Sequence, residues 1–94
     1  MSGKTKRELA KRQIAHAYRN VCLAMRQLGA LETQFAKGHK VHAEHLQVMI
    51  VTLDLIRDGI KVFCTDAWGG YPENWESWRN VGKPDLSGYD LDTV

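Results

Sequence analysis

Apolar residues recur along the first half of the chain with the spacing of one face of a long helix. At intervals of four, three, four, three and seven residues stand Ile14, Tyr18, Val21, Met25, Leu28 and Phe35. These intervals give a 3.5-residue period, the repeat of a helix that packs along another helix. No proline interrupts the stretch, and Gly38 follows it as a stop signal. The pattern predicts a first helix over about residues 4–37.

The second half of the chain carries the same period twice. One stripe has unbroken intervals of four and three residues and comprises His42, Leu46, Met49, Leu53, Ile56, Ile60 and Phe63. A second stripe, with members seven residues apart, comprises Val41, Val48, Leu55 and Val62. At 100° per residue the two stripes span an arc of roughly 200°, whereas a surface helix needs about 100°. The pattern predicts a second helix over about residues 40–66 that packs against more than one partner.

The connection between the two predicted helices is short. It consists of Lys37, Gly38, His39 and Lys40, so the helices must fold back on each other as an antiparallel hairpin. A lone hairpin encloses no core, and we therefore expect self-association into a four-helix or larger bundle. The alternative is that the C-terminal segment folds back and covers the second stripe within one chain. In either case the fold class is all-α, with residues 1–94 forming a single domain.

Residues 67–94 form an irregular, tryptophan-rich tail. Glycines and prolines interrupt regular structure there, although Pro72 to Asn80 is compatible with a short helix that has proline in its first turn. Four large aromatic residues of the segment lie within eleven residues of one another, and they are Trp68, Tyr71, Trp75 and Trp78. Such rings pack against the hairpin or a neighbouring copy, or alternatively provide a stacking platform for a ligand. Residues 85–94 are acidic.

Charge is distributed unevenly along the chain. Residues 1–40 contain nine Lys/Arg and two Glu, a net charge of +7, whereas residues 41–94 contain four Lys/Arg and nine Asp/Glu, a net charge of −5. A basic segment attracts phosphates or acidic partners, and an acidic segment can pair with it, shield it or mimic such a ligand.

The basic half contains a row of arginines on the first helix. Arg12, Arg19 and Arg26 are seven residues apart and so lie on one line, on the flank of the packed face. Guanidinium groups bind phosphate oxygens bidentately, and Tyr18 offers a ring on which a base can stack. Together with Lys37 and Lys40, these residues form the candidate ligand-binding set. The alternative is a solvated helix face, or pairing of the arginines with Glu44, Asp54 and Asp58 of the second helix in another subunit.

Other chemistry receives little support from the sequence. It contains none of the motifs Gly-x-Ser-x-Gly, His-Glu-x-x-His, Walker loop or glycine-rich dinucleotide turn, so we expect no catalytic residues, no enzyme activity and no cofactor. His39, His42 and His45 cannot reach one ion from a straight helix, so we expect no metal site. Cys22 and Cys64 fall in apolar stretches, which predicts reduced thiols. No signal peptide or membrane span is evident, so we expect a cytoplasmic protein.

Two short segments resemble a known family. Arg26-Gln-Leu-Gly-Ala-Leu-Glu32 and His45-Leu-Gln47 are similar to the helical hairpin of the phage anti-CBASS and anti-Thoeris sponges, which sequester cyclic nucleotide signals of bacterial immunity. The resemblance covers about half of the chain. It implies a small helical oligomer in the host cytoplasm that binds a cyclic di- or trinucleotide at subunit junctions without chemistry. In such sites basic side chains hold the phosphates and aromatic rings stack the bases.

Three functional hypotheses follow. The leading one is a non-enzymatic protein that associates with itself and sequesters a small phosphorylated ligand, a cyclic oligonucleotide. The second is a phage-type inhibitor, anti-CRISPR-like or polymerase-directed, that binds a host defence protein through its acidic tail. The third is a nucleic-acid-binding accessory protein that uses the basic helix.

Overall fold

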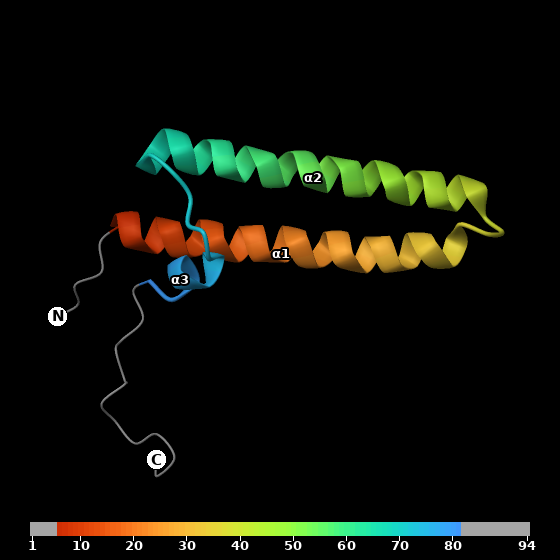
Figure 1. Cartoon of the computed structure of the whole chain (residues 1–94), viewed down its shortest axis with the longest axis horizontal. Coiled ribbons are helices and arrows are strands. Elements are labelled where there is room, and N and C mark those ends of the chain that lie inside the picture. The colour runs from red at the N-terminus through yellow and green to blue at the C-terminus, as the bar shows by residue number, and fades with distance from the viewer. Residues whose placement is uncertain (1–5, 82–94) are drawn as a thin grey trace, which may run out of the picture.

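The computed structural model describes residues 6–81, and this part of the chain is all-helical. Its elements are α1 (Lys6–Phe35), α2 (Lys40–Trp68) and α3 (Trp75–Arg79). α1 and α2 form an antiparallel hairpin, as predicted, and α3 lies beside the N-terminal half of α1 (Figure 1). The acidic segment 85–94 lies outside the described residues. None of the described helices is long and apolar enough to cross a membrane.

The hairpin turn and the end of α2 are set by local backbone bonding. The His39 amide donates to the Phe35 carbonyl, and the Ala43 amide donates to the His39 carbonyl, so one helix passes into the next within four residues. α2 ends where Gly69 adopts a left-handed conformation, with φ of 79°, and donates its amide to the Thr65 carbonyl. This conformation is favourable for glycine because it has no Cβ.

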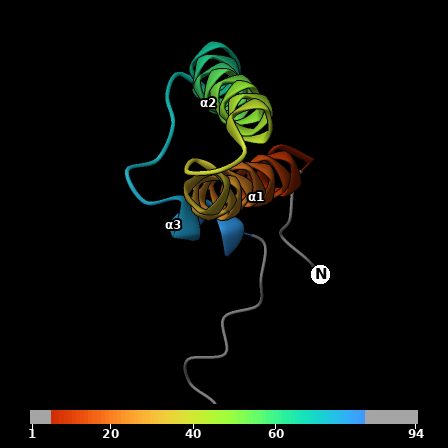
Figure 2. The ribbon, with the colours of Figure 1, turned by 90° about the vertical axis from the view of Figure 1, so that its right-hand side faces the viewer.

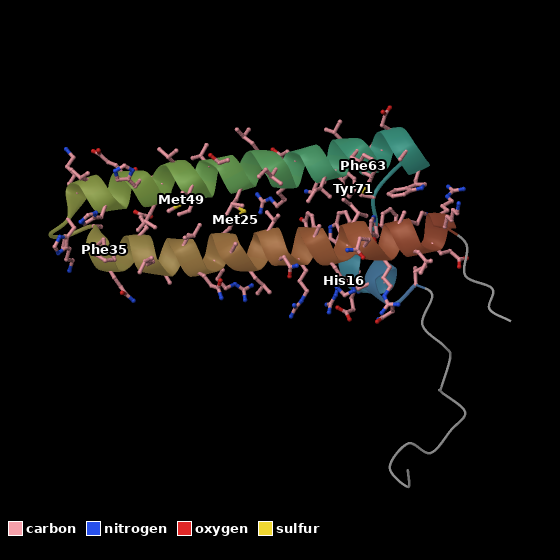
Figure 3. All side chains as sticks on the ribbon, turned by 180° about the vertical axis from the view of Figure 1, so that it is seen from behind. His16, Met25, Phe35, Met49, Phe63 and Tyr71 are labelled. Atoms are coloured by element: carbon pink, nitrogen blue, oxygen red, sulfur yellow. The ribbon has the colours of Figure 1, made fainter. Side chains whose placement is uncertain are left out.

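α1 lies between the two other helices. Seen along the hairpin, α2 and α3 lie on different sides of α1, and the connection from α2 to α3 passes around one edge (Figure 2). Ala15 is fully buried, while the predicted apolar seam of α1, from Ile14 to Phe35, is half-buried. Met25 points from this seam toward α2 (Figure 3). The small Ala15 side chain lets a neighbouring element approach α1 closely.

The predicted packing face of the second helix is only partly correct. The buried and half-buried residues of α2 include one heptad frame, which comprises Ala43, Leu46, Ile50, Leu53, Arg57, Ile60 and Cys64 and forms the face toward α1. The first predicted stripe shares only Leu46, Leu53 and Ile60 with this face. Its other members are exposed, namely His42, Met49, Ile56 and Phe63. Two heptad frames overlap on α2, and the frame with the small residues Ala43 and Cys64 at its ends faces α1.

The second predicted stripe is exposed within the part of the chain that the structure describes. Val41, Val48, Leu55 and Val62 are each 63–68% exposed. Residues 69–81 run from α2 to α1 and pack there, so they do not cover the stripe as the alternative above expected of the C-terminal segment, whose residues 82–94 lie outside the described residues.

α3 is a short helix with a defined start. The Asn74 side chain accepts a hydrogen bond from the Glu76 amide at 3.0 Å, and Arg79 pairs with Glu76 one turn later. An N-cap of this type satisfies an amide that the helix itself leaves without a partner. The helical segment is thus the second half of the predicted stretch from Pro72 to Asn80.

Candidate ligand-binding site

The six predicted ligand residues are distributed along the whole hairpin. Arg12, Arg19 and Arg26 follow one flank of α1, and at a rise of 1.5 Å per residue they span about 21 Å. Lys37 lies in the turn and Lys40 begins α2, so the turn lies about 38 Å from Arg12 along α1. The structure therefore does not gather the six residues into one site within one chain.

The arginine row is available to a ligand. Arg19 and Arg26 are exposed, and Arg12 is half-buried. Among residues 6–81 the ion pairs join Arg57 to Asp54 and Arg79 to Glu76, and neither pair includes an arginine of the row. Within the described chain, then, the acids of α2 do not neutralise the row.

Tyr18 already has an aromatic partner. Its ring stacks on Trp75 of α3 with centroids 4.1 Å apart and an interplanar angle of 15°. Trp75 in turn lies parallel to Tyr71 and edge-on to Trp78. One face of the Tyr18 ring is therefore covered, and a base stacked on Tyr18 would have to use the other face.

These rings belong to a larger aromatic cluster at the open end of the hairpin. Trp68 of α2 contacts Phe63 and Trp78 edge-on, at centroid distances of 5.5 and 5.6 Å. The Lys11 ammonium lies 5.0 Å from the Trp78 ring centroid and 5.9 Å from that of Trp68. A cation at these distances is attracted by the ring quadrupole. Lys11 is thus engaged by the cluster, whereas Arg19 and Arg26 are not.

A hollow of about 420 Å³ lies between α1 and α3 beside the stacked pair. Its lining includes the Tyr18–Trp75 stack, Arg19, Asn74 and Arg79, together with the carboxylates of Glu73 and Glu76. The volume is within the range of small-ligand sites. Because Arg79 is paired with Glu76, Arg19 is the cation in this hollow whose guanidinium is not in an ion pair.

Comparisons of the chain with protein-family models, with characterised proteins and with solved structures find no match. The resemblance of the two short segments to the phage sponge hairpin therefore stays a prediction.

Arg57 is a charged residue whose position could not be predicted from the pattern of apolar residues. It occupies the α1-facing side of α2 and pairs with Asp54. Burial lowers the pKa of Arg57, but the Asp54 carboxylate and the neighbouring Cys22 and Tyr18 raise it more, so the net pKa shift is upward. The guanidinium remains charged and lies near Cys22 and Tyr18 of α1. An arginine between Leu53 and Ile60, one heptad from Ile50 and Cys64, is the sequence signal for this position.

The Cys64 thiol and the imidazoles of His39 and His42 take part in packing. Cys64 is fully buried, and burial raises the pKa of its thiol while the Lys11 charge opposes the shift. A raised pKa disfavours the nucleophilic thiolate. His39 and His42 contact the Phe35 ring edge-on at the turn. The described residues contain no group of three His, Cys, Asp or Glu side chains that could hold a metal ion.

Proposed function

We propose that this chain is a non-enzymatic binding protein that associates with itself and sequesters a small phosphorylated ligand, a cyclic oligonucleotide, at a junction between copies. The observation that carries the proposal is the exposure of Arg19 and Arg26, which have no ion pair within the described chain. The resemblance to the phage sponge hairpin points to the same ligand class.

A junction between copies follows from the spacing of the row. Successive arginines are about 10.5 Å apart along α1, so a compact ligand contacts only one or two of them on one copy. Cations from a second copy would complete the coordination of its phosphates. The hollow beside Arg19 supplies an apolar wall, because the Tyr18–Trp75 stack borders it.

The test is calorimetry with cyclic dinucleotides and trinucleotides on the full chain. Hydrogen bonds to charged groups contribute about 1.5–3 kcal/mol, so Arg19→Ala should weaken binding roughly 10- to 150-fold. Arg26→Ala should act in the same direction. Arg7→Ala is the matched control, because this exposed arginine lies on another face of α1 and should leave the affinity unchanged.

Light scattering on the same variants separates a binding role from an assembly role. The arginine variants should keep the mass of the unsubstituted protein. The absence of heat with micromolar ligand, or dissociation of the assembly by Arg19→Ala, would contradict the proposal.

The row also favours a second candidate, an accessory protein that binds nucleic acid. Arg12, Arg19 and Arg26 run parallel to the helix axis over about 21 Å, which matches an extended phosphate backbone better than a compact ligand. Binding of duplex DNA would then fall with salt at a slope of about −0.9 per phosphate contacted. Affinity for a cyclic nucleotide with no binding of duplex DNA excludes this candidate. For the acidic-tail inhibitor, deletion of residues 85–94 is the corresponding test.

A further inference from the structure

The side of α2 that faces away from α1 is an apolar surface along the whole helix. Its large apolar side chains are between 43% and 68% exposed, and they are Val41, Val48, Met49, Val51, Leu55, Ile56, Val62 and Phe63. α2 also buries Leu46, Ile60 and Cys64 against α1, so it is apolar on two sides. A helix with two apolar sides normally packs against a partner on each of them.

We infer that this surface binds the same surface of a second copy, with the two α2 helices antiparallel and Val48 of one copy facing Gly59 of the other. The inference deepens the self-association in the proposed function by naming its interface, and it requires no ligand. The result is a four-helix assembly with the two α2 helices at its centre.

The order of large and compact residues favours the antiparallel orientation. Val41, Val48, Leu55 and Val62 alternate along the surface with the compact or polar residues His45, Thr52, Gly59 and Asp66. In an antiparallel pair each layer joins one large residue to one compact residue, namely Val48 to Gly59, Leu55 to Thr52 and Val62 to His45. A parallel pair would place large on large and glycine on glycine, which leaves alternating clashes and voids.

The compact residues of the surface are suited to burial. The Thr52 hydroxyl donates to the Val48 carbonyl at 2.8 Å, so its donor is satisfied before any partner arrives. A Cβ built on Gly59 would have nothing within 4 Å, so the space above it is open to a neighbouring side chain. Glycine inside a helix costs roughly 1 kcal/mol relative to alanine, and close approach of a second helix gives a reason for it at this position.

Charge complementarity selects the same orientation. The antiparallel pair brings the turn residue Lys37 and Lys40, at the start of α2, beside the end of the second copy's α2 that carries Asp66. At this register Glu44 lies level with Phe63 and Asp58 lies level with Met49, so no two carboxylates lie opposite each other. In a parallel pair Asp66 of one copy would face Asp66 of the other, and the two negative charges would repel each other.

The available area is that of a small stable dimer. Complete burial of a Val, Leu, Ile, Phe or Met side chain removes about 60–120 Å² of apolar surface at about 25 cal/mol per Å². The eight side chains, about half exposed, then contribute about 400 Å² per copy, or about 800 Å² for the pair. Since about 60% of an interface is apolar, the total is about 1,300 Å², within the range of about 1,200–2,000 Å² for specific complexes.

Disulfide formation between two single variants tests the orientation. His45→Cys and Val62→Cys are oxidised separately and as a mixture, and linked peptides are identified by mass. We expect a 45–62 link in the mixture only, because like positions lie about 25 Å apart in the antiparallel pair. Links within the separate samples, or links at neither position in a protein that is oligomeric by light scattering, would overturn the inference.

Leu55→Glu tests the surface independently of cross-linking. This residue is 66% exposed in the single chain, so the substitution should leave helical circular dichroism unchanged and convert the dimer to a monomer. The matched control is Gln27→Glu, which adds the same charge at an exposed position of α1 and should remain dimeric. A monomeric unsubstituted protein, or a dimeric Leu55→Glu variant, would overturn the inference. A 45–62 link in a protein that binds no nucleotide contradicts only the proposed ligand.

Discussion

The stack of Trp75 on Tyr18 should hold α3 against the hairpin, and Trp75→Ala is the substitution that tests this contact. Trp75 is half-buried and lies against three other rings, those of Tyr18, Tyr71 and Trp78. α3 has only five residues, and a helix of this length is not stable without contacts such as those of the aromatic cluster. Loss of the indole should therefore detach α3 locally and leave α1 and α2 paired.

The magnitude follows from the buried area. A tryptophan buries about 150–250 Å² when fully covered, so a half-buried one loses about 75–125 Å², or about 2–3 kcal/mol at about 25 cal/mol per Å². When cleavage follows a fast local opening, its rate follows the population of the open form. An increase of about 30- to 150-fold in that population is then expected, up to the limit set by a fully detached α3.

The assay is limited trypsin digestion, with cleavage after Arg79 quantified by mass spectrometry. Glu73→Ala is the matched control, because it changes an exposed residue of the α2–α3 connection without removing a ring. Trp75→Phe should lie between the two, since a smaller ring can still stack. A cleavage rate after Arg79 that is unchanged in Trp75→Ala would refute the assignment of α3 stability to this stack.

Two further predictions concern the thiols and the end of α2. Because burial raises the pKa of Cys64 above its usual 9.0, its neutral thiol adds stability below that pH, and this contribution should be lost as the pH rises toward the raised value. In denaturant unfolding, the unsubstituted protein should accordingly lose more stability than Cys64→Ala as the pH rises above 9.0, and iodoacetamide should alkylate the half-buried Cys22 first. Gly69→Ala should destabilise by about 1 kcal/mol because its φ is positive, lowering the melting temperature by about 4–8 °C. Gly70→Ala, where φ is not positive, is its control, and equal melting temperatures for the two variants would contradict the explanation.

The hairpin could be predicted from the sequence because its evidence is local. Long runs with a 3.5-residue period, no proline before Pro72 and a four-residue connection are sufficient for two antiparallel helices. Which face of the second helix turns inward could not be predicted in the same way. Two heptad frames share Leu46, Leu53 and Ile60, and the choice between them depends on the fit of Ala43 and Cys64 against α1.

The candidate site was predictable only as a set of residue types. The arginine row follows directly from the seven-residue spacing, and the structure keeps Arg19 and Arg26 exposed. The cover on Tyr18 was not predictable, because it depends on the path of residues 69–74 around the edge of the hairpin. Such a path is set by tertiary packing at a distance along the chain and leaves no periodic signal.

The position of the aromatic cluster at the open end of the hairpin has a consequence for the order of folding. Contacts near the turn close short loops, whereas the Tyr18–Trp75 stack closes a loop of about 57 residues and costs more chain entropy. The helices should therefore pair first near the turn, and the contacts of the aromatic cluster should form last. Because all three tryptophans belong to the cluster, the late step would dominate the fluorescence signal in refolding. Far-ultraviolet circular dichroism, which follows the long helices, should then reach its final value earlier.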